Sequence, residues 1–201
     1  MEKEKVIIAS RNQGKIEEIS NMLAKYGIDA VSRDEFGVPK FEVEETGSTF
    51  EENSLLKAET IMSMVNMPVI ADDSGLEVYA LGGAPGVYSA RYAGEGCTMQ
   101  DNRDKMLFEL GDIPDEKRTA RFATVITLLY PDGEKLVARG ECEGKIIAEE
   151  RGEKGFGYDP IFVPFGYDIT FAEMSQEEKN AISHRGKALI LLEDLIRGRD
   201  K

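Results

Sequence analysis

The stretch Ala71-Asp72-Asp73-Ser74-Gly75-Leu76 places two carboxylates and a hydroxyl directly after the apolar run Pro68-Val69-Ile70-Ala71. Such a run, stopping at acids and a glycine, predicts a buried strand that ends here. Strand ends in open α/β sheets are common ligand sites, and adjacent buried carboxylates favour a cationic partner such as a metal ion. The alternative is a turn in which solvated Asp72 and Asp73 cap backbone N–H groups.

The overall composition narrows the class of protein. The chain has 201 residues, 41% of them hydrophobic and 31% charged, which suits a single domain over residues 1–201. Its formal net charge of −13 argues against a duplex DNA binder and against attachment to an anionic membrane. An anionic substrate stays compatible with this charge if cations gather locally or a metal ion supplies them.

The rare residue types exclude several kinds of site. The single histidine, His184, rules out a multi-histidine metal site, and Cys97 and Cys142 have neither zinc spacing nor a disulfide framework. The N-terminal Met1-Glu2-Lys3-Glu4-Lys5 precedes only four apolar residues. We therefore expect neither a signal peptide nor a membrane span, and a cytoplasmic location.

Strand and helix signals alternate in the first half of the chain, and a hairpin dominates the second. Capping boxes at Thr49-Phe50-Glu51-Glu52 and Ser175-Gln176-Glu177-Glu178 predict two helix starts, and Thr98 predicts a third. The predicted strands are 6–9, 68–71, 76–80, 118–130, 135–140 and 161–163, and further helices follow residues 15 and 185. This order predicts an α/β fold with a mixed sheet.

The segment Ser10-Arg11-Asn12-Gln13-Gly14-Lys15 lies between a predicted strand and a predicted helix. Free N–H groups and the helix dipole make such a junction an anion site, to which Arg11 and Lys15 add charge. The glycine spacing is not that of a P-loop, and an ordinary turn is the alternative. We expect the Lys15 ammonium at the surface, so that its removal leaves stability nearly unchanged.

Two further segments carry candidate ligands. One of Glu42, Glu44 and Glu45 could join Asp73 around a divalent cation, the alternative being a solvated acidic loop. Gly155-Phe156-Gly157-Tyr158-Asp159 could expose a ring for base stacking, the alternative being a turn with a core phenylalanine. Lys179 and Ser183-His184-Arg185-Gly186 add hydrogen-bond donors, although a lone histidine is more often structural.

Together, in this order and spacing, these pieces resemble the inosine/xanthosine triphosphate pyrophosphatase family over nearly the whole chain. The departure from the family pattern is Ser10-Arg11 before Asn12, where Thr-Gly or Thr-Asn is more usual. The matching segments are 10–15, Glu45-Thr46-Gly47-Ser48-Thr49-Phe50-Glu51-Glu52-Asn53, 71–76, Leu81-Gly82-Gly83-Ala84-Pro85-Gly86-Val87-Tyr88-Ser89-Ala90-Arg91, Gly155-Phe156-Gly157-Tyr158-Asp159-Pro160, Glu178-Lys179 and Ile182-Ser183-His184-Arg185.

The resemblance implies a cytosolic homodimer with an elongated mixed sheet, flanking helices and two lobes around a central cleft. It implies Mg²⁺-dependent hydrolysis of ITP, dITP and XTP to monophosphate and pyrophosphate, with Mn²⁺ able to replace Mg²⁺, which cleanses the nucleotide pool. Glu45 and Asp73 would bind the metal, and Asp73 would also be the general base. The implied substrate contacts are Ser10, Arg11, Asn12, Gln13, Gly14, Lys15, Lys57, Ser74, Arg91, Phe156, Gly157, Tyr158, Asp159, Lys179, His184 and Arg185.

Two other functions fit parts of the pattern. One is a nucleotide-binding sensor without catalysis, which gives no role to the acidic cluster. The other is a pyrophosphatase for pyrimidine triphosphates, against which the Phe156–Asp159 and His184–Arg185 elements favour a purine. Nucleic acid and membrane partners are not expected.

Overall fold

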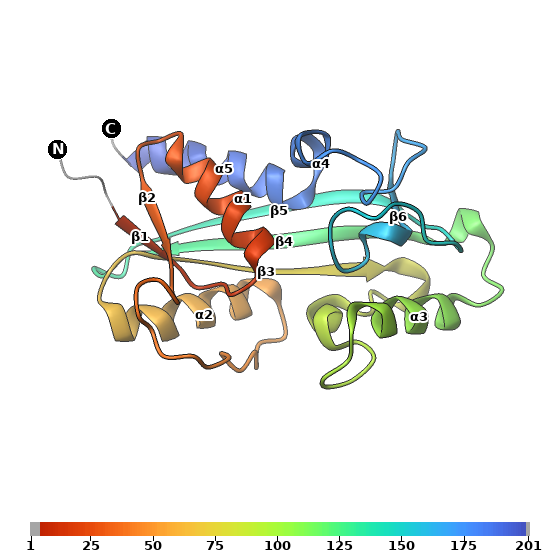
Figure 1. Ribbon diagram of the computed structural model, residues 1–201, viewed down its shortest axis with the longest axis horizontal. Coiled ribbons are helices and arrows are strands. Elements are labelled where there is room, and N and C mark those ends of the chain that lie inside the picture. The colour runs from red at the N-terminus through yellow and green to blue at the C-terminus, as the bar shows by residue number, and fades with distance from the viewer. Residues whose placement is uncertain (1–4, 200–201) are drawn as a thin grey trace. The chain divides into compact units, whose positions relative to one another are not determined.

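The computed structural model describes residues 5–199 and contains one six-stranded sheet of order β2-β1-β3-β4-β5-β6 (Figure 1). β1 pairs in parallel with β2 and β3, whereas β5 and β6 are antiparallel. The sheet is therefore mixed and helices flank it, which confirms the predicted α/β class. The strands are β1 (Lys5–Ile8), β2 (Asp29–Ser32), β3 (Val69–Val78), β4 (Thr119–Leu129), β5 (Lys135–Ile146) and β6 (Phe162–Pro164).

Within the part of the chain that the structure describes, five α-helices connect or follow these strands. Thr49, Thr98 and Ser175 each accept a backbone N–H at a helix start, and each start is a complete capping box, as predicted for Thr49 and Ser175. The helices are α1 (Gln13–Ala24), α2 (Phe50–Val65), α3 (Met99–Leu110), α4 (Gln176–Ile182) and α5 (His184–Arg199). Within residues 5–199, no helix is both long enough and apolar enough to cross a membrane.

The chain divides into two compact units. Of the described residues, the first unit holds 5–73, 125–139 and 188–199, and the second holds 74–124 and 140–187. β3 passes from the first unit to the second between Asp73 and Ser74. The elongated shape and the central cleft implied by the resemblance stay predictions.

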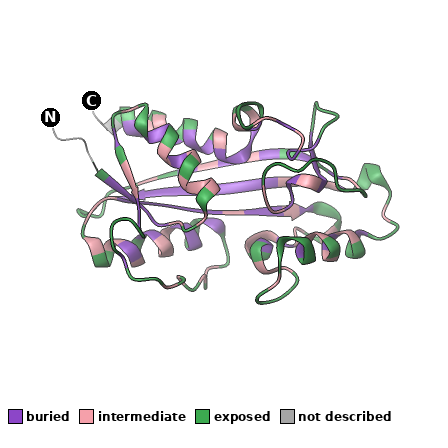
Figure 2. Cartoon of the chain, viewed as in Figure 1, coloured by how far each residue is buried: buried purple, intermediate pink, exposed green. Residues whose placement is uncertain are grey.

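The first unit has an apolar core on each face of its strands, because successive side chains of a strand point to opposite faces. Val6 and Ile8 of β1 belong to the core under α1 and α5, and Ile7 belongs to the core under α2. Ile70 of β3 likewise joins the α1 core. Figure 1 shows α1 and α2 on opposite sides of these strands, and Figure 2 shows the strands buried between them.

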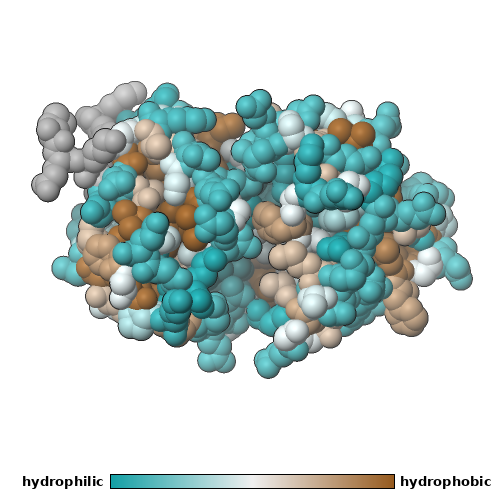
Figure 3. Space-filling model, viewed as in Figure 1, coloured by the Kyte–Doolittle hydropathy of each residue, from teal (hydrophilic) through white to brown (hydrophobic). Residues whose placement is uncertain are grey.

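Aromatic rings from β4, β6 and a neighbouring loop form the centre of the core of the second unit. The ring centroids of Phe122 and Phe162 are 4.7 Å apart, and those of Phe162 and Phe171 are 5.0 Å apart. Met106 and Leu110 of α3 complete this core. Outside the cores, hydrophilic residues cover most of the face shown in Figure 3, in keeping with the charged composition.

Two predicted strand boundaries are wrong. The strand expected to end at Ala71 continues as β3 to Val78, so the separate strand expected from 76 to 80 does not exist, and the turn alternative fails as well. The chain stays extended because Asp72 and Asp73 are buried beside lysines, so that burial of their charges does not end the strand. The predicted hairpin forms, but β5 runs on past Gly140 to Ile146.

Candidate functional site

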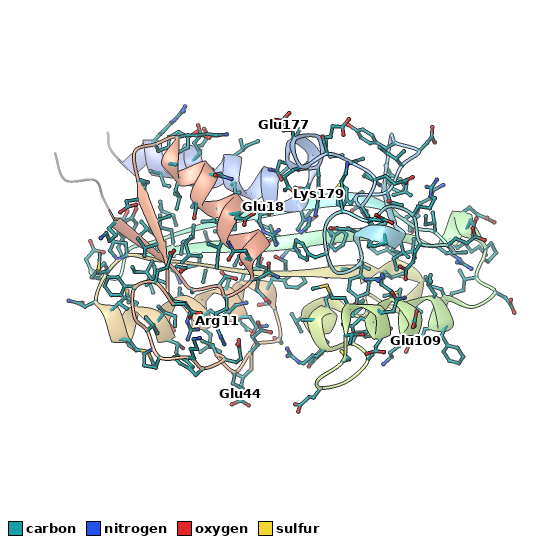
Figure 4. All side chains as sticks on the ribbon, viewed as in Figure 1. Arg11, Glu18, Glu44, Glu109, Glu177 and Lys179 are labelled. Atoms are coloured by element: carbon teal, nitrogen blue, oxygen red, sulfur yellow. The ribbon has the colours of Figure 1, made fainter. Side chains whose placement is uncertain are left out.

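Asp73 and Glu45 share one ammonium group in the first unit. Lys57 Nζ on α2 lies 2.9 Å from Asp73 Oδ1 and 3.0 Å from Glu45 Oε1. Asp73 is 5% exposed, and Lys57 and Glu45 are half-buried. Of the three candidate glutamates, Glu45 is therefore the one that shares a partner with Asp73. Glu42 pairs with Arg11 instead, and Glu44 is exposed (Figure 4).

Asp72 belongs to the other face of the same strand. Its Oδ2 lies 2.8 Å from Lys15 Nζ, at the start of α1, whereas Asp73 meets Lys57 of α2. This division follows the strand alternation, which sends neighbouring side chains to opposite faces of the sheet. The expectation that the Lys15 ammonium lies at the surface is wrong, because the Lys15 side chain is only 17% exposed and its partner Asp72 is buried.

Burial and the neighbouring charges shift the pKa values of this cluster. Burial raises the pKa of Asp73 above its usual value, and the nearby Lys57 ammonium only partly offsets this effect. Burial by itself lowers the pKa of Lys57, but Asp73, Asp72 and Glu45 outweigh it, so the net direction is upward.

The segment from Ser10 to Lys15 forms the predicted helix start. Asn12 is the N-cap of α1, and its Oδ1 accepts the Lys15 backbone N–H at 3.2 Å. Arg11 donates to Glu42 at 2.7 Å and also pairs with Asp34. Gly14 is half-buried, Gln13 bonds to Glu17 and Ser10 accepts from the Asn12 N–H. Of this segment, Lys15 pairs with Asp72 of β3, whereas Arg11 pairs with Glu42 of the acidic loop and with Asp34.

The second unit holds a buried ion pair beside an aromatic ring. Lys179 Nζ on α4 (Figure 4) donates to Asp159 Oδ2 at 2.7 Å, and the same oxygen accepts the Phe156 N–H at 2.8 Å. The ammonium lies 4.9 Å from the centroid of the Phe156 ring. Gly155 has φ +77°, and an added Cβ would lie 2.1 Å from Asp159 Oδ2. The tight loop therefore needs glycine there to place Phe156 over the pair.

Arg185 and His184 begin α5 beside this pair. The Arg185 guanidinium carbon is 5.8 Å from the Phe156 ring centroid, and Arg185 donates to Ser74 Oγ at 3.3 Å. His184 is buried and stacks on Phe122, with ring centroids 4.8 Å apart. The second unit thus gathers Phe156, Asp159, Lys179, Arg185 and Ser74 into one cluster and places His184 against an aromatic ring of the core.

Three further predicted residues of the second unit make other contacts. The Tyr158 hydroxyl donates to the Ser89 carbonyl oxygen at 2.9 Å, and the side chain is part of the core. The Gly157 carbonyl accepts from Arg103 of α3. Arg91 ends a short 3₁₀ turn and lies over the Tyr88 ring, 5.2 Å from its centroid.

The oxygen ligands of the first unit fit Mg²⁺ in type and number. Among residues 5–199, no three His, Cys, Asp or Glu side chains gather in a way that could hold a metal ion by themselves. Mg²⁺, however, is commonly bound through one or two carboxylates, with substrate phosphates and water completing the coordination. Asp73 and Glu45 already share a cation, the Lys57 ammonium, which shows that both can face the same positive charge.

Sequence reasoning missed one residue of this cluster. Asn53 is fully buried on α2 and donates to Asp73 Oδ2 at 3.3 Å. On α2, Asn53 and Ser54 are buried, whereas the neighbouring Leu55 and Leu56 are only half-buried. The spacing could have indicated it: Asn53 and Lys57 are four residues apart and therefore lie on one face of the helix.

Comparisons with known proteins agree over almost the whole chain. A dITP/XTP pyrophosphatase of Bacillus cereus is 50% identical over 194 residues, covering 95% of this chain and 94% of that protein. One of Salmonella typhimurium is 49% identical over 196 residues, covering 96% and 98%. The solved structure of the Staphylococcus aureus Ham1 protein matches with a TM-score of 0.88 and 45% identity, covering 98% of this chain and 100% of that one. Since the model of the Ham1 family also matches residues 6–195, this chain belongs to the Ham1 family.

Proposed function

We propose that this chain hydrolyses non-standard purine nucleoside triphosphates, namely ITP, dITP and XTP, to the monophosphate and pyrophosphate. Curated relatives about half identical to it are named dITP/XTP pyrophosphatases. The single structural observation that carries the proposal is the buried Asp73 that shares Lys57 with Glu45. A binding protein without chemistry would gain nothing from a buried and a half-buried carboxylate beside a polyanionic ligand.

In the proposed mechanism, Asp73 accepts the proton of the attacking water. Lys57 and Asn53 each donate to one oxygen of this carboxylate, and so hold it in the fixed position that a general base requires. Lys57 and Lys15 hold the triphosphate as fixed cations, and Glu45 and Asp73 hold Mg²⁺. When bound, Mg²⁺ supplies positive charge that offsets the charge developing on the phosphate oxygens. No covalent nucleophile is required in this scheme, and water attacks the phosphorus directly.

The cluster of the second unit selects the base. Phe156 stacks on the purine, and Arg185, Lys179 and His184 donate to acceptor atoms on its edge. Asp159 fixes Lys179, because its Oδ2 already accepts both the ammonium and the Phe156 N–H. A 6-oxo purine presents an acceptor where adenine presents an amino donor, and arginine can only donate.

The experiment is incubation of the protein with ITP and Mg²⁺, with separate assays for pyrophosphate and orthophosphate. We expect one pyrophosphate per inosine monophosphate, and loss of activity in excess chelator that Mg²⁺ or Mn²⁺ restores. Orthophosphate with a diphosphate product would contradict the reaction. Binding of ITP without turnover would favour a sensor instead.

A homodimer and a cytoplasmic location are also part of the proposal, and both rest on the family resemblance. Light scattering coupled to gel filtration tests the first, with twice the mass of the chain expected. Fractionation of cells that express the untagged protein tests the second.

A further inference from the structure

We propose that Asn53 is a positioning residue, which holds Asp73 and the loop that carries Glu45 in a fixed relation to each other. This inference rests on the proposed function, because Asp73 and Glu45 are the carboxylates assigned to the metal ion. Asn53 itself is not assigned to the substrate or to the metal.

The side-chain amide of Asn53 bridges two segments of the first unit. Its Nδ2 donates to Asp73 Oδ2 on β3 at 3.3 Å, and its Oδ1 accepts the Gly47 N–H at 2.8 Å. The residue is 0% exposed, so no bulk water is available to replace either bond. A buried amide that uses both ends in this way transmits the position of one segment to the other.

Both oxygens of Asp73 are held by α2. Oδ1 accepts from Lys57 at 2.9 Å and Oδ2 accepts from Asn53, one helical turn earlier. Two donors on one rigid helix fix the plane of the carboxylate. An ionised carboxylate offers about four lone-pair sites, so these two bonds leave sites for a metal ion and for a water molecule.

The loop before α2 is tied to the same helix. Ser48 N–H donates to Glu52 Oε2 at 2.7 Å, next to the bond from Gly47 to Asn53. A Cβ added at Gly47 would lie 2.6 Å from Asn53 Oδ1 and 2.7 Å from Glu52 Cβ, so the loop passes too close for any side chain. Glu45 lies two residues before this anchored point, and its place beside Lys57 therefore depends on Asn53.

The first test is Asn53→Ala, with Mn²⁺ alone as the probe and its dissociation constant measured by electron paramagnetic resonance. Loss of a partner that orients metal ligands typically weakens metal affinity about 10- to 100-fold, and we expect that range. Amide hydrogen exchange should also speed up at Gly47, because its acceptor is gone.

The matched control is Asn102→Ala in the second unit. Asn102 is also buried, its Oδ1 accepts the Ala93 N–H at 2.7 Å and its Nδ2 donates to the Ala90 carbonyl at 3.1 Å. It thus ties a loop to a helix without touching Asp73. We expect Asn102→Ala to lower the melting temperature about as much as Asn53→Ala does, and to leave the Mn²⁺ affinity unchanged.

A second variant keeps the inference testable if Asn53→Ala does not fold. Asn53→Asp retains the shape and the acceptor for Gly47, but it replaces the donor to Asp73 with an oxygen. The Gly47 N–H should stay protected from exchange. The kcat for ITP should fall at least tenfold, as is typical when a group that orients a metal ligand is lost, and KM should change little.

Each outcome decides the question. The inference is overturned if folded Asn53→Ala binds Mn²⁺ with a dissociation constant within about twofold of the wild-type value, because loss of an orienting partner should weaken binding by more than that. A kcat of Asn53→Asp equal to that of wild type would overturn it as well. If the wild-type protein itself binds no Mn²⁺ and hydrolyses no ITP, the proposed function has failed, which is a different result from loss of the effect in the variants alone.

Discussion

The polar clusters of the two units are built from different groups. In the first unit, the carboxylates of Asp72, Asp73 and Glu45 meet two ammonium groups, those of Lys15 and Lys57. In the second unit, the carboxylate of Asp159 meets Lys179, and the Lys179 ammonium and the Arg185 guanidinium both lie near the Phe156 ring.

The difference indicates what each cluster can bind. Carboxylates that already share an ammonium group favour a cation such as Mg²⁺. Hydrogen-bond donors beside an aromatic ring favour a planar group that both stacks and accepts hydrogen bonds. In the proposed function, the first cluster therefore serves the chemistry and the second serves recognition, and substitutions in the two clusters should have different effects.

The largest expected effect concerns recognition. If donors of the second unit read the 6-oxo group, ATP leaves buried donors unpaired, and its kcat/KM should be lower than that of ITP by up to about 10⁴-fold. Arg185→Ala should shrink this ratio mainly by slowing ITP. Steady-state kinetics with ITP, XTP, GTP and ATP measure the kcat/KM values from which this ratio is taken. GTP shares the 6-oxo group, so these donors cannot reject it.

Lys187→Ala is the control for that experiment, since it removes an exposed cation two residues further along α5. It should leave the ITP/ATP ratio unchanged. Comparable wild-type kcat/KM values for ITP and ATP would contradict the proposed specificity. If Arg185→Ala leaves the ITP/ATP ratio of kcat/KM unchanged, Lys179 or a backbone N–H contacts the 6-oxo group instead.

The next prediction compares how much the ion pairs Lys179–Asp159 and Lys15–Asp72 contribute to stability. Lys179 and Asp159 are both almost fully buried, so Lys179→Met should lower the free energy of unfolding by about 3–5 kcal/mol. Lys15 is more exposed, and Lys15→Met should lower it by about 1.5–3 kcal/mol, the range of a hydrogen bond to a charged group. Urea unfolding measures both, and equal losses would refute the ranking.

The third prediction separates the neighbouring aspartates of the first unit. Asp73→Asn should reduce kcat about 10²-fold or more, because a general base is lost together with a metal ligand. Asp72→Asn weakens the pair with Lys15 and should mainly reduce stability. The measurement is kcat for ITP at saturating Mg²⁺ in variants whose folding circular dichroism has verified. Equal losses of kcat would show that the assignment of roles is mistaken.

Features that depend on neighbouring residues could be predicted from the sequence, whereas features that depend on distant residues could not. The capping boxes at Thr49 and Ser175 were predictable because a cap depends on residues within one turn of each other. The continuation of β3 through Asp72 and Asp73 was not, because it depends on Lys15 and on the distant α2. Local patterns cannot show that a buried charge will be compensated from elsewhere in the chain.

The candidate sites show the same limit. The family resemblance implied Phe156, Asp159 and Lys179 as substrate contacts, but not that Asp159 is committed to Lys179 and to the loop backbone. It also treated Lys15 as a surface group. Motif order identifies which residues gather, whereas burial and the sharing of partners are properties of the packed structure.

The smallest expected effect compares the helix starts of the two units through their pH dependence. Hydrogen bonds from the backbone N–H of Ser48 and of Ser175 lower the pKa values of Glu52 and Glu178, respectively, below the usual 4.5. Because the folded-state pKa is lower, each carboxylate contributes stability above its unfolded pKa, which is lost as the pH falls through the folded-state value. Glu52→Gln and Glu178→Gln should each lower the melting temperature slightly at neutral pH and flatten its fall between about pH 5 and pH 3. Thermal unfolding over this range tests both, with exposed Glu59→Gln as the control on α2. Because the same bond pattern occurs in both units, an effect for one helix start and none for the other would show that local capping does not govern the acid stability of this chain.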